Sequence, residues 1–247
     1  RLDYSHEFSN YVAAFQHYTR IVARQIESVL EALYSTPAGK NTIVIVLADH
    51  GDGMGSHRMV TKQVSFYEEM TNVPFIIAGP GIHPRQKPVE DLLTQPTIDL
   101  LPTLCELAGI PVPSSKPGIS LAPFLKGEKQ KRQHPYAASE WHSEYEVTVS
   151  PGRMIRSPRY KYTHYLEGNG EELYDMLKDK GERRNLAHDP KYSKILAEHR
   201  ALLDDYIRRT QDDYRSLKVE ADKRWRSHAP GYPNHEGPCA RDIINRK

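Results

Sequence analysis

A short run of β-branched and aliphatic residues that ends in a polar loop constrains the fold of this chain more than any other feature. Residues 42–48 are Thr-Ile-Val-Ile-Val-Leu-Ala, with no alternation of apolar and polar side chains. Such a run favours a strand covered on both faces, as in a parallel sheet. Residues 49–53 (Asp-His-Gly-Asp-Gly) follow at once. Because α/β sheets bind ligands beyond the carboxyl ends of their strands, we expect a site in this loop.

The segments on either side of this run predict α/β architecture. Residues 8–34 place apolar side chains at three- and four-residue spacing, which predicts a long amphipathic helix. Residues 73–78 predict a second short buried strand, and residues 100–108 a short helix with Pro102 in its first turn. A helix, a strand and a polar loop in this order are typical of an α/β unit.

A different pattern begins after residues 111–135, which are rich in Pro, Lys and Gly and predict a domain boundary. Residues 153–156 and 160–166 are strand-like runs joined by a Ser-Pro dipeptide, which predicts a hairpin. Asp189 followed by Pro190 predicts the start of a helix with one apolar face. A small antiparallel sheet with a packed helix is the simplest interpretation.

Composition excludes several classes of protein. With 38% hydrophobic and 27% charged residues, the chain has the profile of a globular protein and not of a disordered one. A net charge of +2 gives no indication of nucleic-acid binding. We expect no membrane span, because no run of about 18 apolar residues exists. Cys105 and Cys239 are the only cysteines, too few for a disulfide framework, and Cys105 is predicted to be a buried free thiol.

Candidate chemical groups are concentrated just after the apolar run. Asp49 is a suitable ligand for a hard cation, and His50 could complete the ligand set. His57, Arg58 and Lys62 offer donors or positive charge to a tetrahedral oxyanion. Ester hydrolysis at sulfur or phosphorus needs such groups where negative charge develops. Asp-His-Gly is also a common turn sequence, so the complete order of residues, and not the tripeptide, indicates a site.

That order resembles the second signature region of the sulfatases, a family within the alkaline-phosphatase superfamily. The similarity extends to the flanking segments and covers roughly residues 8–210. The resembling segments are 26–33 (IESVLEAL), 73–75 (VPF), 79–82 (GPGI), 98–110 (IDLLPTLCELAGI), 153–162 (RMIRSPRYKY), 172–175 (ELYD) and 182–186 (ERRNL).

The resemblance implies a fold and its division. Residues 1–125 would be the C-terminal portion of the sulfatase catalytic α/β domain, part of a large mostly parallel sheet with flanking helices. Residues 126–217 would form a smaller α+β C-terminal subdomain with an antiparallel sheet and a helix. Residues 218–247 would be an extended tail.

The resemblance also implies roles for individual residues. Asp49 matches the metal-binding aspartate of the family, and His50 the adjacent position, which also faces the metal. Lys62 matches the catalytic lysine that binds a sulfate oxygen. His57 and Arg58 fall where relatives contact the substrate or the leaving group. The metal is usually Ca²⁺, with Mn²⁺, Mg²⁺ or Zn²⁺ as alternatives.

Glu68, Glu69 and His142 are further residues that the resemblance concerns. Glu68 and Glu69 match a family pair that we interpret as structural. His142 lies in residues 139–145 (Ser-Glu-Trp-His-Ser-Glu-Tyr), where similar sulfatases place loops over the mouth of the active site. A Trp-His pair could bind a sugar substrate there, although a packed loop is the alternative.

The sulfatase nucleophile is not found in this sequence. The family uses a formylglycine made from Cys or Ser in a Cys/Ser-x-Pro-x-Arg motif, and neither Cys105 nor Cys239 begins one. The chain also opens without an initiator Met or a signal peptide. We therefore expect the upstream half of the same protein as a second chain or a missing segment, and an inactive chain alone.

The resemblance implies a sulfuric ester hydrolase that acts on a sulfated carbohydrate such as a glycosaminoglycan, in a periplasmic, lysosomal or secreted location. Two alternatives stay open. One is a phosphodiesterase or phosphonate monoester hydrolase of the same superfamily, which His50 favours mildly because imidazole suits manganese or zinc. The other is a non-catalytic sugar-binding relative.

Overall fold

The computed structural model divides into two compact units. The first comprises residues 1–138, 156–160 and 176–183, and the second residues 139–155, 161–175 and 184–247. The domain boundaries expected from the sequence stay predictions, and the tail at 218–247 lies outside the described residues. Those residues are 5–59, 65–90, 92–114, 117–129, 134–141, 151–166 and 170–217.

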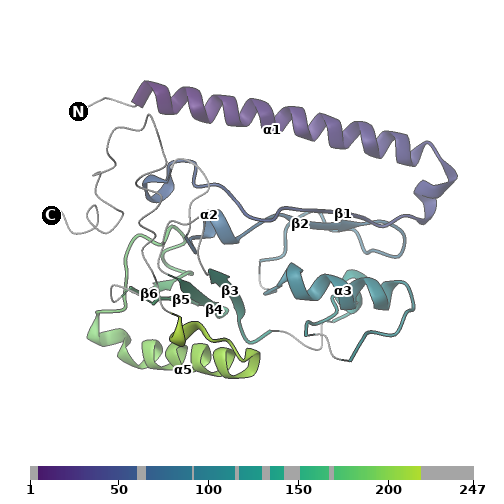
Figure 1. Ribbon diagram of the computed structural model, residues 1–247. Helices are drawn as coiled ribbons and strands as arrows, with labels where there is room; N and C mark the ends of the chain where they lie inside the picture. Colours follow the sequence, from purple (N-terminus) through teal and green to yellow (C-terminus); the bar gives the residue numbers. More distant parts are fainter. Residues whose placement is uncertain are drawn as a thin grey trace. The chain divides into compact units, whose positions relative to one another are not determined.

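The first unit contains the long helix, a two-stranded sheet and the helices that follow it (Figure 1). Its elements are α1 (Ser5–Tyr34), η1 (Pro37–Asn41), β1 (Val44–Leu47), η2 (Ser56–Arg58), α2 (Glu68–Thr71), β2 (Phe75–Ala78), α3 (Pro96–Leu107) and α4 (Ala122–Leu125). The prediction of a helix over residues 8–34 is confirmed by α1. Its apolar side chains are largely exposed, among them Phe15, Tyr18, Val22 and Val29.

The strands β1 and β2 lie side by side and pair in antiparallel register, with Val44 opposite Ala78 and Leu47 opposite Phe75 (Figure 1). The apolar run favoured a strand of a mostly parallel sheet, and the pairing of these two strands with each other is antiparallel. The side chains of Leu47 and Ile76 are also exposed. A continuous apolar run fits strands of either direction, so the run by itself does not fix how a strand pairs with its neighbour.

Helix α3 is organised by a buried carboxylate. Asp99 has no exposed surface and accepts hydrogen bonds from the backbone N–H groups of Gln95 (2.7 Å) and Ile119 (2.8 Å). Nε2 of His134 lies 2.7 Å from the same carboxylate. Asp99 thus joins the helix start to two later segments of the chain, which stabilises the unit because each buried polar group is partnered.

The helix start and the cysteine differ from the predictions. The helix begins at Pro96, so Pro102 lies inside it and not in its first turn. Pro96 occupies a first-turn position, where its missing N–H costs nothing. Cys105 is a free thiol, as expected, but it is only partly buried because this face of the helix is not fully covered.

The second unit is built on the four-stranded sheet, whose strands run in the order β3-β4-β5-β6. The strands are β3 (Ala137–Trp141), β4 (Gly152–Arg156), β5 (Tyr160–Tyr165) and β6 (Glu171–Asp175), followed by η3 (Pro190–Tyr192), α5 (Ser193–Thr210) and η4 (Tyr214–Ser216). The neighbouring strands β4 and β5 match the predicted hairpin. Asp189 accepts a hydrogen bond from the Lys191 N–H (3.1 Å), as expected of a helix cap.

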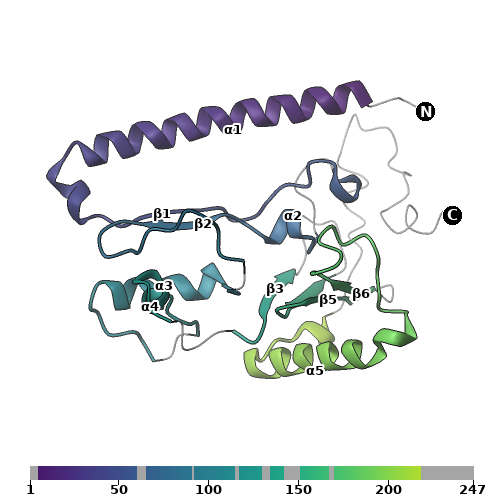
Figure 2. The same ribbon diagram turned by 180° about the vertical axis from the view of Figure 1, so that it is seen from behind.

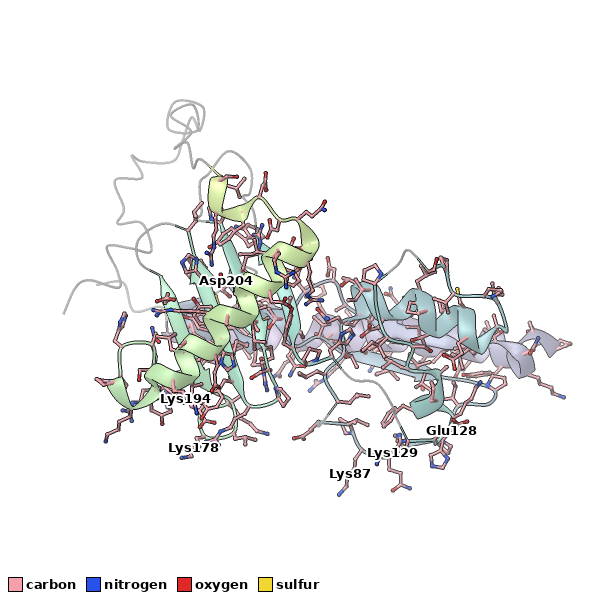
Figure 3. The ribbon with its side chains drawn as sticks, turned by 90° about the horizontal axis from the view of Figure 1, so that it is seen from below. Lys87, Glu128, Lys129, Lys178, Lys194 and Asp204 are labelled. Carbon is pink, nitrogen blue, oxygen red and sulfur yellow. The ribbon has the colours of Figure 1, made fainter. Side chains whose placement is uncertain are left out.

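Helix α5 lies along this sheet (Figures 1 and 2) and buries Leu196 and Leu203. Figure 3 looks onto the opposite side of α5, with Lys194 and Asp204 labelled along it. Among the described residues, no helix combines the length and the apolar character that crossing a membrane requires.

A charged network joins α5 to the sheet. The hydroxyl of Tyr162 donates to Glu171 (2.5 Å), and Arg200 donates to the same carboxylate through Nε (2.7 Å). The hydrogen bond from Arg200, aided by Tyr162 and opposed by desolvation, lowers the pKa of Glu171 from 4.5 to about 2. The ionised carboxylate is therefore the form that the fold stabilises.

This network predicts a pH-dependent part of the stability of the longer protein. Because the folded-state pKa of Glu171 is depressed, its contribution is complete above about pH 4.5 and disappears as the pH falls towards 2. The loss of melting temperature caused by Glu171→Gln should therefore shrink over that window. Glu198→Gln, at an exposed site on α5, should change the melting temperature little at any pH. An unchanging deficit for Glu171→Gln would contradict the role of this carboxylate.

Candidate active site

The predicted ligand pair, Asp49 and His50, follows the end of β1 after one residue, Ala48. The His50 N–H donates to Asp49 Oδ1 (2.9 Å), and the Asp49 side chain is 87% exposed. His50 Nδ1 lies 2.8 Å from the carbonyl oxygen of Gly51. His50 Nε2 lies 3.6 Å from Asp49 Oδ2, so the two side chains present an oxygen and a nitrogen next to each other.

These two residues fit part of a metal site. A histidine whose Nδ1–H donates to a backbone carbonyl presents Nε2 with a free lone pair, the arrangement common among metal-binding histidines. Ligand bonds of about 2.0–2.6 Å allow two donor atoms at this separation to reach one ion. Within the described ranges, no group of three or more His, Cys, Asp or Glu side chains could hold a metal. Further ligands would have to come from elsewhere in the protein.

Gly51 fastens this loop to the segment before β2. Its N–H donates to the carbonyl oxygen of Met70 (2.9 Å). A Cβ at Gly51 would lie only 1.8 Å from the carbonyl oxygen of Glu69. No other residue type fits this close backbone approach, so a glycine at this position brings the predicted ligands to their place.

The next part of the loop, residues 52–59, is in contact with the start of α1. Gly55 has φ 89°, and a Cβ there would lie 2.3 Å from the ring of Phe8. The Gly55 N–H donates to the Met59 carbonyl oxygen (2.7 Å). Desolvation, the charge of Asp52 and a hydrogen bond to it raise the pKa of Tyr11. The loop thus contacts residues of α1 that lie more than forty positions earlier in the sequence.

His57 has a left-handed backbone, with φ 51° and ψ 25°. Such a conformation costs a non-glycine residue about 1–3 kcal/mol and is found most often at functional sites. The imidazole is stacked on the ring of Tyr67, with 3.6 Å between ring centroids and 1° between planes. Of the other sequence-predicted site residues, the Arg58 side chain, Lys62 and His142 lie outside the described residues.

Residues that the sequence did not single out contact Glu68, the first residue of the glutamate pair. The Glu68 N–H donates to Glu182 Oε2 (2.6 Å), and Glu68 Oε1 lies 3.9 Å from Arg156 Nε. Burial lowers the pKa of Arg156, opposed by the charges of Glu68 and Glu182. These contacts support the structural interpretation of Glu68. Only the presence of Glu182 in a segment that resembles the sulfatases could have drawn attention to it.

A family model described as N-sulphoglucosamine sulphohydrolase, C-terminal, matches residues 55–209. The chain belongs to the sulfatase family. This confirms the resemblance seen in the sequence, and the α/β fold class with it. The family is metal-dependent, in keeping with the Asp49–His50 pair.

Individual relatives agree with this assignment. The chain is 75% identical over 240 residues to the Delta 4,5-hexuronate-2-O-sulfatase of Bacteroides thetaiotaomicron, covering 97% of this chain and 50% of that protein. A solved structure of a 2-O GAG sulfatase matches 96% of this chain and 51% of its own, with a TM-score of 0.86 and 75% identity. The phosphonate monoester hydrolase of Silicibacter pomeroyi is 26% identical with a TM-score of 0.66, over 80% of this chain and 42% of its own. This chain therefore spans about half the length of the two relatives that are 75% identical to it.

The close approach at Gly51 generates a test. Gly51→Ala should destabilise the longer protein by about 1–3 kcal/mol, because its methyl group meets backbone that cannot move freely. The control is Gly181→Ala, whose Cβ would make only an ordinary contact at 3.6 Å with Arg183. That variant should stay within about 0.5 kcal/mol of the parent. Urea unfolding measures both, and equal midpoints would show that the loop tolerates the displacement.

Proposed function

We propose that the protein acts, as part of a longer sulfatase, as a metal-dependent sulfuric ester hydrolase on a sulfated carbohydrate. This proposal rests on the 75% sequence identity, over 97% of the chain, to a Delta 4,5-hexuronate-2-O-sulfatase. It supports the 2-O-sulfate of a Δ4,5-unsaturated hexuronate, a glycosaminoglycan unit, as the ester. The sulfatase family also suits a periplasmic, lysosomal or secreted location.

Asp49 and His50 are the proposed metal ligands of this chain. The exposed carboxylate is supported as a ligand by the preference of hard cations for oxygen, which favours Ca²⁺. His50 keeps Mn²⁺, Mg²⁺ and Zn²⁺ as alternatives, since imidazole suits the transition metals. When bound, the ion supplies positive charge beside the sulfate oxygens.

The remaining roles concern the substrate. Lys62 would bind a sulfate oxygen and offset the negative charge that develops on the transferring group. His57 and Arg58 would contact the substrate near the ester oxygen, and His142 would contact the sugar. The stacked imidazole of His57 supports its part, because an ordered donor is needed where a bond is broken.

The formylglycine nucleophile and the further metal ligands are proposed for the upstream half of the same protein. The length of the relatives supports this, since the chain covers 50% of the hexuronate sulfatase. The exposed apolar side chains of α1, such as Val22 and Val29, also support it. Exposed apolar patches of this kind are typical of surfaces that another part of a protein covers.

The alternative is a phosphonate monoester hydrolase, supported by the 26% identity to the enzyme of that name and by the imidazole ligand. An assay of the longer, metal-free protein separates the two. We expect sulfate release from a 2-O-sulfated unsaturated disaccharide, restored best by Ca²⁺ and faster than hydrolysis of a phosphonate monoester. Faster phosphonate hydrolysis with Mn²⁺ or Zn²⁺ would favour the alternative, and sugar binding without turnover would indicate a non-catalytic relative.

Lys62→Ala tests the proposed sulfate contact in the longer protein. Removing one donor of this kind should reduce transition-state stabilisation by about 2–4 kcal/mol, measured as kcat/KM for sulfate release. Lys40→Ala, at an exposed site before β1, is the control and should leave kcat/KM unchanged. Sulfate release at the parent rate in Lys62→Ala would exclude the role proposed for Lys62.

A further inference from the structure

The rings of His57 and Tyr67 are stacked face to face, closer together than aromatic side chains usually pack. The ring centroids are 3.6 Å apart, and the planes differ by 1°. Two neutral aromatic rings prefer offset or edge-to-face arrangements with centroids about 4.5–7 Å apart. A face-to-face contact this close is held by the backbone on both sides, since His57 has φ 51° in η2 and Tyr67 precedes α2 directly.

The Tyr67 side of the pair is well anchored. Tyr67 is the N-cap residue of α2, and its carbonyl oxygen accepts from the N–H groups of Met70 (2.9 Å) and Thr71 (3.0 Å). The adjacent Glu68 N–H donates to Glu182, and the Met70 carbonyl accepts from Gly51. The backbone that carries the phenol ring is therefore fixed by several hydrogen bonds.

The His57 side is a short loop held by backbone hydrogen bonds. Hydrogen bonds from the Ser56 N–H to Gly53 (2.8 Å) and from the Met59 N–H to Ser56 (2.9 Å) fix the backbone around it. They do not fix the rotation of the imidazole, whose outer torsion has a broad energy profile. The tyrosine face restricts that rotation and leaves the ring edge, with both nitrogens, as the part that can donate or accept.

We infer that Tyr67 is a positioning residue that acts through His57. By covering one face of the imidazole, it holds the ring in a single plane, so that an edge nitrogen is presented to an oxygen of the bound sulfate ester. This inference rests on the proposed function, because it assigns Tyr67 to the contact between His57 and that ester. An error in placing such a group can lower turnover by about 100-fold.

The test uses the longer protein and two substitutions at one position. Tyr67→Phe keeps the aromatic face and should retain kcat/KM within about twofold, because the stack needs only the ring. Tyr67→Leu removes the face and should lower kcat/KM for sulfate release by about 10–100-fold. Tyr67→Met replaces Tyr67→Leu if the latter fails to reach the parent unfolding midpoint.

A double-mutant cycle separates positioning from a general structural role. In a His57→Asn background, Tyr67→Leu should cause no further loss, because its effect passes through the imidazole. Equal losses in both backgrounds would overturn the inference, as would parent activity in Tyr67→Leu.

A spectroscopic measurement keeps the inference separate from the proposed function. In histidine-labelled protein, the His57 ring protons, assigned with His57→Asn, should be shifted upfield by the tyrosine ring current. Tyr67→Phe should preserve the shift and Tyr67→Leu should abolish it. If the parent protein releases no sulfate, the proposed function fails. The chemical shift of the His57 ring protons still shows whether the imidazole is stacked on Tyr67. An unshifted resonance in the parent would overturn the inference directly.

Discussion

The backbone contact between Gly51 and residues 69–70 is the constraint on which the candidate site depends. It closes the loop that follows β1 onto the segment that precedes β2. On one side of this contact lie Asp49 and His50, and on the other lies Tyr67, whose ring meets His57. A single hydrogen bond at a position without room for a side chain thus joins the proposed metal ligands to the segment that contacts His57, a proposed substrate contact.

The same segment extends this coupling to the later part of the chain. Glu182 is 114 residues from Glu68, yet its carboxylate accepts from the Glu68 N–H and caps the first turn of α2. Arg156, from the end of β4, adds a charge beside both glutamates. Glu182 is buried and the side chains of Glu68 and Arg156 are partly buried, so the guanidinium compensates carboxylate charge that water reaches only in part. Segments 156–160 and 176–183 therefore belong to the first unit.

What the sequence could predict was local. Periodicity identifies α1, a Ser-Pro turn identifies the β4–β5 hairpin, and Asp189 before Pro190 identifies a helix cap, since each signal lies within a few residues. The β1–β2 pairing direction, the contact from Glu182 and the His57–Tyr67 stack depend on distant segments or on backbone conformation. No residue spacing encodes these contacts, although the polar loop after the apolar run and the family resemblance both pointed to the region around Asp49 and His57.

The exposure of Asp49 and the exposure of apolar side chains on α1 can be explained together. Asp49 is 87% exposed and has only His50 beside it as a metal ligand among the described residues, whereas metal sites of hard cations use six or more ligands. The α1 helix, in turn, exposes an apolar stripe that a stable protein buries. One further segment of the protein, placed against α1 and over the loop after β1, would add metal ligands beside Asp49 and cover the apolar side chains of α1. The hexuronate sulfatase of which this chain covers 50% is long enough for one such segment, so under the proposed function a single upstream segment would meet both needs.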